Sequence, residues 1–154
     1  MTPKQGTRVM FGILAAVLAL VAIQRVLWMR SAPAVSPLPA SFLNASTLSQ
    51  AEEKSRTDNR PVLVFATADW CGPCQVLKRT TLAETKVTDA IDRLTHPTLV
   101  DITIHDPNAE KLSVNSVPAL ILMKNGQELA RLEGIASTEE VLAFLDEAKS
   151  APTP

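Results

Sequence analysis

The two cysteines of this chain, Cys71 and Cys74, are the only two among its 154 residues. With two residues between them, they can close one intramolecular disulfide with little movement of the backbone. That disulfide closes too short a loop to restrict the unfolded chain much, which argues against a purely structural bond. A zinc site usually needs two more Cys or His ligands, and the chain offers only His96 and His105. We therefore interpret the pair as a redox couple and expect neither a metal nor another cofactor.

The residues around the pair predict where it lies in the fold. The run 60–67 is rich in β-branched and aromatic residues, and it predicts a buried strand that leads to the cysteines. Pro73 is tolerated in a first helical turn, so a helix is expected to begin at Cys71. There the free backbone N–H groups and the helix dipole favour a thiolate over a thiol. Cys71 is thus the predicted nucleophile, and Cys74, one turn inside the helix, is the predicted resolving thiol.

The sequence Trp70-Cys-Gly-Pro-Cys74, placed after a hydrophobic strand, resembles the active-site motif of thioredoxins. The resemblance extends through Val117-Pro118 to Gly134 and covers roughly residues 46–149. It implies that Pro118 follows a cis peptide bond and packs beside the cysteines. It also implies that Val117 offers its backbone N–H and C=O groups to an extended substrate strand. The resemblance further implies that Trp70, Gly72 and Pro73 complete the active-site motif around the two cysteines.

One position departs from that resemblance. Thioredoxins carry a buried aspartate six residues before the first cysteine, where it helps to move the proton of the resolving thiol, and here that position is Phe65. The lysine that partners this aspartate has no clear counterpart either. Asp101 is the nearest candidate for a substitute acid, although we favour a solvated Asp near a strand end. The hypothesis is that the resolving step is slower at neutral pH, or that water carries the proton.

We predict an α/β fold of the thioredoxin-like class, a central mixed β-sheet flanked by helices and preceded by one N-terminal transmembrane helix. One domain of ~110 residues is enough to form a modest core. Asn125-Gly126 is a strong hairpin signal, and Ser137 to Glu140 is a capping box that opens the last helix. The predicted elements are helices over 45–57, 85–94 and 107–112, a helix from Cys71, and strands over 60–67, 99–104, 119–124 and 127–132.

The N-terminal part of the chain has a different character. Val9 to Ile23 is a run of fifteen residues without a charge or a strongly polar side chain. Residues 9–29 come near the ~20 needed to cross the hydrocarbon core as a helix, with Trp28 at a plausible interface depth. A cleaved signal peptide is the alternative, because Ala32-Pro-Ala34 loosely fits a cleavage site. We favour a retained anchor, since the apolar stretch is long for a signal peptide.

The distribution of charge bears on orientation and on partners. Residues 1–40 carry four Lys or Arg and no acids, and the other 114 carry 11 basic and 16 acidic side chains, a net charge of −5. Nothing basic is left in the domain to hold nucleic acid. The positive-inside bias is slight and favours a cytoplasmic N-terminus. The predicted location is the inner (cell) membrane, single-pass, with the domain facing the periplasm or extracytoplasmic side.

The predicted function is that of a membrane-anchored thiol-disulfide oxidoreductase acting on disulfides or thiols of other proteins outside the cytoplasm. Gly72-Pro73 resembles the dipeptide of reducing thioredoxins, which favours a reductase. The chain has no further cysteines through which to receive electrons, so a separate redox partner must supply them. The alternative is a non-catalytic tethered peptide-binding or chaperone module that uses the Val117-Pro118 groove. The predicted organisation is a cytoplasmic N-terminus (1–8), a transmembrane anchor (9–29), a Pro/Ala/Ser-rich linker (30–44), a thioredoxin-like domain (45–150) and a disordered tail (151–154).

Overall fold

The structure is a computed structural model that describes residues 3–30 and 35–150, with side chains over 12–25 and 35–147. The chain divides into two compact units, residues 1–34 and residues 35–154. The predicted tail, 151–154, and part of the predicted linker, 31–34, lie outside the described residues. Each unit is described separately below.

The first unit contains the helix α1 (Pro3–Arg30), which includes the whole of the predicted anchor 9–29. Its described side chains are all exposed. Within the part of the chain that the structure describes, no helix is both long enough and apolar enough to cross a membrane. Residues 9–11 and 26–29 of the predicted anchor lie outside the described side chains. The large apolar side chains of α1 that are 48–64% exposed are Ile13, Leu14, Val17, Leu18, Leu20, Val21 and Ile23.

Within residues 35–150, the second unit is built on a four-stranded sheet with the order β2-β1-β3-β4. The strands are β1 (Val62–Thr67), β2 (His96–Asp101), β3 (Ala119–Lys124) and β4 (Gln127–Glu133). β1 runs parallel to β2 and antiparallel to β3, and β4 pairs antiparallel with β3. All residues of the central strands β1 and β3 are buried, because both faces of the sheet are covered. This mixed sheet flanked by helices confirms the fold predicted for the domain.

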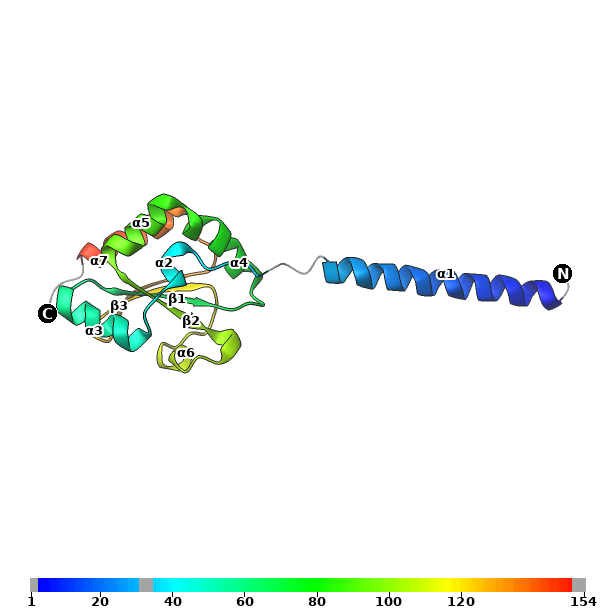
Figure 1. Ribbon diagram of the computed structural model, residues 1–154, viewed down its shortest axis with the longest axis horizontal. Coiled ribbons are helices and arrows are strands. Elements are labelled where there is room, and N and C mark those ends of the chain that lie inside the picture. The colour runs from blue at the N-terminus through cyan, green and yellow to red at the C-terminus, as the bar shows by residue number, and fades with distance from the viewer. Residues whose placement is uncertain (1–2, 31–34, 151–154) are drawn as a thin grey trace. The chain divides into compact units, whose positions relative to one another are not determined.

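Helices cover both faces of this sheet (Figure 1). They are α2 (Ala40–Leu43), α3 (Leu48–Asp58), α4 (Gly72–Arg79), α5 (Thr85–Leu94), α6 (Asn108–Lys111) and α7 (Thr138–Ser150), with the 3-10 turns η1 (Thr81–Ala83) and η2 (Ile102–Ile104). On one face, side chains of α2, α4, α5 and α7 enclose a core with Phe65 of β1. On the other face, α3 and α6 pack with Val64 of β1. Successive β1 side chains therefore supply opposite cores, as the alternation of a strand requires.

Strand β2 is displaced from its predicted range, 99–104, to His96–Asp101. Its end is set by Asp101, whose carboxylate accepts a hydrogen bond from the Thr103 N–H at 2.8 Å and caps η2. This cap turns the chain out of the sheet and into a 3-10 turn. Pro97 disfavours an early strand start, but β2 lies at the edge of the sheet, where a proline is tolerated.

The domain begins earlier than the predicted boundary at residue 45. Its compact unit starts at Val35, inside the predicted linker 30–44. Phe42 of α2 is 2% exposed and belongs to the core on the α5 face of the sheet. Ser41 also donates a hydrogen bond through Oγ to the Thr88 carbonyl of α5, at 3.4 Å. We call residues 35–42 the N-terminal strap. The sequence predicts them to be part of a linker because they are rich in proline, but their apolar and polar contacts make them part of the domain.

Candidate active site

The two cysteines form a disulfide at the start of α4, immediately after the end of β1. Cys71 is the N-cap residue of this helix, and its Sγ accepts a hydrogen bond from the Cys74 N–H at 3.1 Å. Gly72 and Pro73 occupy the first helical positions, where the missing N–H of proline costs no helical hydrogen bond. The strand and the helix that the sequence predicts around the pair are both present. The first turn of α4 therefore directs the Cys74 N–H toward Cys71 Sγ.

Both cysteines of the disulfide are buried. Cys74 is fully buried and Cys71 is 4% exposed. Ala68 completes a small cluster with them, and the partly buried Ile102 and Val117 pack against it. Cys71 is thus the less buried residue of the pair.

The Val117–Pro118 peptide bond is cis, as the resemblance to thioredoxins implies. The Val117 carbonyl oxygen lies 3.5 Å from Cys71 Sγ, so residues far apart in sequence meet at the disulfide. The Gly134 N–H donates a hydrogen bond to the Pro118 carbonyl at 2.8 Å, which attaches the end of β4 to the same loop. The structure therefore brings together Cys71, Val117 and Pro118, three of the predicted site residues.

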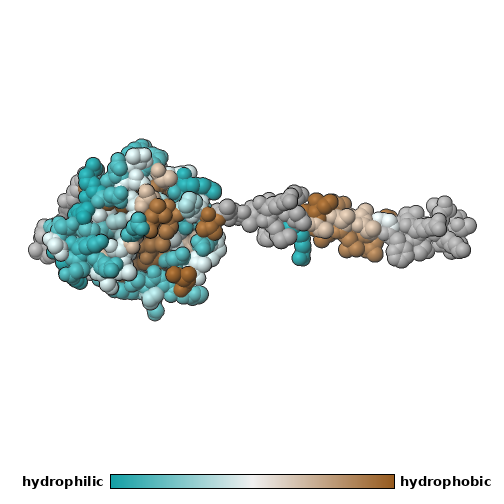
Figure 2. Space-filling model, viewed as in Figure 1, coloured by the Kyte–Doolittle hydropathy of each residue, from teal (hydrophilic) through white to brown (hydrophobic). Residues whose placement is uncertain are grey.

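The remaining residues of the predicted motif lie on the surface next to the cysteines. Trp70 is 69% exposed, and Gly72 and Pro73 are exposed as well. Large apolar side chains are also exposed on neighbouring segments, Ile104 of η2 at 74% and Ile135 after β4 at 60%. Figure 2 shows brown patches on a domain surface that is otherwise largely teal. Such exposed apolar surface is typical of a site that contacts another protein.

The turn that carries Cys71, residues 68–71, is fixed by two polar side chains that the sequence did not single out. The Asp69 N–H donates a hydrogen bond to Thr103 Oγ1 at 2.8 Å. Gln75 donates through Nε2 to the carbonyls of Ala68 and Asp69, at 3.1 and 3.2 Å. Polar residues in a loop or on a helix are usually solvated, so neither Thr103 nor Gln75 gives a signal in the sequence.

Phe65 lies where thioredoxins carry their buried aspartate, and the structure places it fully inside the core. No carboxylate can therefore come from this position. Asp101, the candidate for a substitute acid, is occupied in capping η2 through Thr103. Thr67, two residues beyond Phe65 on the same strand, is 1% exposed, and its Oγ1 has no hydrogen-bond partner among the described residues. The position six residues before Cys71 is thus apolar, and the nearest polar group on the same strand is a hydroxyl.

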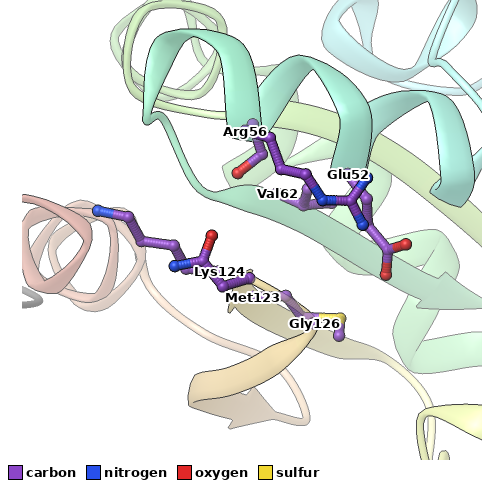
Figure 3. Close-up of a pocket in the computed structure, with 8 residues that line it drawn as sticks. Glu52, Arg56, Val62, Met123, Lys124 and Gly126 are labelled. Atoms are coloured by element: carbon purple, nitrogen blue, oxygen red, sulfur yellow. The ribbon is translucent and has the colours of Figure 1, made fainter. Parts of the chain in front are cut away.

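A small pocket lies away from the disulfide, between α3 and the β3–β4 hairpin (Figure 3). It is lined in part by Arg56, Val62 and Lys124. Val62 is the first residue of β1, whereas Cys71 comes four residues after its last, Thr67, so this pocket and the disulfide lie at opposite ends of the strand. The amino group of Lys124 extends away from the Arg56 guanidinium in Figure 3, so the two cations do not converge on one ligand. Among the described residues, no group of three or more His, Cys, Asp or Glu is placed to hold a metal ion.

A mixed sheet with a disulfide at the N-terminus of the helix after β1, facing a cis-proline loop, defines a protein that exchanges disulfides. The family described as Thioredoxin-like domain matches residues 48–149 of the chain. The chain belongs to this thioredoxin-like family and is a thiol-disulfide oxidoreductase. Thioredoxin-like proteins use a redox-active disulfide rather than a separate cofactor, and Cys71 and Cys74 supply that group here.

The relatives of the chain include both thioredoxins and larger proteins. The thioredoxin of Chlamydia trachomatis is 37% identical over 87 residues, which cover 54% of this chain and 78% of that protein. The thiol:disulfide interchange protein DsbD of Campylobacter jejuni is 23% identical over 112 residues, 69% of this chain but only 19% of DsbD.

Solved structures show the same fold. A thioredoxin from Thermus thermophilus has a TM-score of 0.61 at 20% identity, with 70% of this chain and 87% of that chain covered. The oxidised C-terminal domain of Neisseria meningitidis DsbD has a TM-score of 0.57 at 18% identity, with 65% and 90% covered.

Proposed function

We propose that the chain is a membrane-anchored reductase of protein disulfides outside the cytoplasm, with Cys71 as nucleophile and Cys74 as resolving thiol. The observation that carries the chemical part is the position of Cys71 Sγ, at the N-cap of α4 and 3.5 Å from the Val117 carbonyl. Such a sulfur combines backbone N–H groups that favour a thiolate with a backbone carbonyl beside which a substrate strand can lie.

The proposed reaction starts from the dithiol form of the pair. The Cys71 thiolate attacks one sulfur of the substrate disulfide, whose S–S bond breaks, and the departing substrate sulfur takes up a proton. Cys74 then loses its proton, and its thiolate attacks Cys71 Sγ in the mixed disulfide. The second substrate sulfur leaves as a thiol, and the Cys71–Cys74 disulfide of this structure is the oxidised product. Two electrons have passed to the substrate, and a second protein with a dithiol must return them.

The recognition of substrate is proposed to use the loop before Pro118. An extended segment beside Val117 would pair with its backbone N–H and C=O groups, which makes the interaction independent of substrate sequence. Exposed Trp70 and Ile135 would add apolar contact around the reacting sulfurs. Protein disulfides of many sequences are therefore the proposed substrates.

The proposed anchor rests on the sequence of α1. Val9 to Ile23 carries no charge, and seven large apolar side chains of the helix are at least 48% exposed. A helix that leaves this much apolar surface uncovered needs an apolar environment. Extraction of membranes at alkaline pH tests the anchor, since a retained span stays in the pellet. Protease treatment of intact spheroplasts tests the orientation, because an outward-facing domain is digested.

Trapping tests the chemistry and separates the enzyme from a non-catalytic peptide-binding module. With Cys74→Ala, Cys71 remains covalently joined to its partners, and mass spectrometry of the complexes identifies the substrate and the electron donor. The matched control is the double variant Cys71→Ser with Cys74→Ala, which should trap nothing. A full chain that binds the same partners equally well with and without Cys71 would favour the binding module instead. A measured reduction potential near that of DsbA, about −120 mV, would contradict a reductase.

A further inference from the structure

Gln75 is a polar side chain buried at 1% exposure, directly after Cys74 on α4. The side-chain amide of Gln75 forms hydrogen bonds with two separate segments of the chain. Oε1 accepts a hydrogen bond from the Ser36 N–H of the N-terminal strap at 2.7 Å. Nε2 donates to the carbonyls of Ala68 and Asp69 at 3.1 and 3.2 Å. Gln75 therefore joins the strap to the turn that carries Cys71.

The strap holds α4 through a second hydrogen bond as well. Ser36 donates through Oγ to the Gln75 carbonyl at 3.3 Å, so the N–H and the hydroxyl of Ser36 both donate to the same residue. A buried amide without partners is strongly unfavourable, whereas a fully bonded one rigidifies its surroundings. The position of Gln75 thus depends on the strap and on the turn together.

The turn 68–71 fixes the backbone of Cys71, the proposed nucleophile. The Ala68 carbonyl accepts a hydrogen bond from the Cys71 N–H at 3.3 Å, in addition to the bond from Gln75. Both backbone polar groups of Asp69 are hydrogen-bonded, its N–H to Thr103 and its carbonyl to Gln75. Loss of the Gln75 amide would remove one hydrogen bond from each of two carbonyls in this turn and would leave the Ala68 carbonyl only its bond from the Cys71 N–H.

We propose that Gln75 is a positioning residue of the redox pair and that the N-terminal strap holds it in place. It acts through the turn 68–71 and keeps Cys71 Sγ where the Cys74 N–H can donate to it. This hydrogen bond matters most for the thiolate of the reduced pair, because a charged sulfur is a stronger acceptor. The inference rests on the proposed function of Cys71 as the nucleophile.

The test uses the full chain with Gln75→Met, which preserves the length of the side chain but removes its hydrogen bonds. Two properties are measured: the pH midpoint of Cys71 thiolate formation, from ultraviolet absorbance, and the equilibrium of the pair with reduced and oxidised glutathione. The midpoint should move to higher pH. The equilibrium constant for reduction should fall about fivefold, the factor that corresponds to one net hydrogen bond. If both values equal those of the wild type in a folded variant, the proposal is overturned.

A pair of strap variants provides a second test in case Gln75→Met does not fold. Ser36→Pro removes the N–H that Gln75 Oε1 accepts, whereas Ser36→Ala keeps this N–H and removes only the Oγ contact. Ser36→Pro should shift both properties in the same direction as Gln75→Met, and Ser36→Ala should shift them less. Equal values for Ser36→Pro and the wild type would contradict the role of the strap. Neither measurement needs a protein substrate, so both remain informative even if the chain reduces no protein disulfide, which would defeat the proposed function alone.

Discussion

The ring of Phe42 packs against the ring of Phe65, with centroids 5.3 Å apart and planes inclined at 54°. Phe65 belongs to the central strand β1, and Phe42 belongs to α2 at the end of the N-terminal strap. A position that holds a carboxylate in thioredoxins therefore serves here as a contact that attaches the strap. An aromatic pair, Phe42 and Phe65, thus stands where thioredoxins have the buried aspartate.

The first prediction concerns this aromatic contact. Phe42→Ala should lower the free energy of unfolding by about 3 kcal/mol, because it removes a large side chain from a close-packed core. The control is Leu43→Ala on the same helix, since Leu43 is 60% exposed and its loss should change stability little. Urea denaturation of the full chain measures both. Similar midpoints for the two variants would show that the strap does not contribute to the core.

The second prediction concerns the hydroxyl of Thr67, which is buried without a partner among the described residues. Thr67→Val removes this hydroxyl and keeps the shape of the side chain, so the free energy of unfolding should rise by about 1 kcal/mol. Thr98→Val is the matched control, because Thr98 is fully buried and donates to the Ser46 carbonyl at 2.7 Å. That variant should be destabilised instead. A destabilised Thr67→Val would mean that the hydroxyl is bonded in solution.

The third prediction concerns acid stability. Burial alone would raise the pKa of Asp58, but hydrogen bonds from His96 and Arg60 outweigh it and hold that pKa well below its usual range. The carboxylate therefore stabilises the fold fully above its unfolded pKa of about 4, and this contribution is lost as the pH falls below that value. Asp58→Asn should flatten the decline of the unfolding free energy between about pH 5 and pH 2. The exposed Asp89→Asn serves as control and should leave the slope unchanged.

The fourth prediction concerns the proton of the resolving thiol. Asp101 caps η2 through the Thr103 N–H, and an asparagine can accept the same hydrogen bond. Asp101→Asn should therefore leave the rate of mixed-disulfide resolution and its pH profile unchanged. Stopped-flow measurement with a mixed disulfide at Cys71 tests this. A slower resolving step at neutral pH would instead make Asp101 the substitute acid.

Much of the redox site could be predicted from local patterns. The strand before Cys71 and the helix after it follow from hydrophobic periodicity and from Pro73, and the resemblance to thioredoxins supplied the cis bond at Pro118. Each of these features depends on a short stretch of sequence. The hairpin at Asn125-Gly126 likewise formed where its turn residues predict it.

The strap and its contact with Gln75 could not be predicted in this way. Proline-rich sequences such as residues 31–40 have the composition of a spacer, and only the tertiary contacts of Ser36 and Phe42 place the segment on the domain. Strand β2 was shifted for a related reason, because the cap at Asp101 decides where the strand ends. In the strap, contacts between distant segments override local composition, whereas in β2 a local side-chain cap sets the end of the strand.

The sheet has two outer strands, β2 and β4, and both discourage the addition of a strand from another chain. Pro97 in β2 lacks the N–H that such pairing needs. β4 carries the charged residues Glu128, Arg131 and Glu133, and its pairing with β3 shifts register near Met123. Copies of the domain are therefore hindered from aggregating edge to edge. A thiol-disulfide oxidoreductase that acts on other proteins is thereby hindered from binding further copies of itself through its sheet edges.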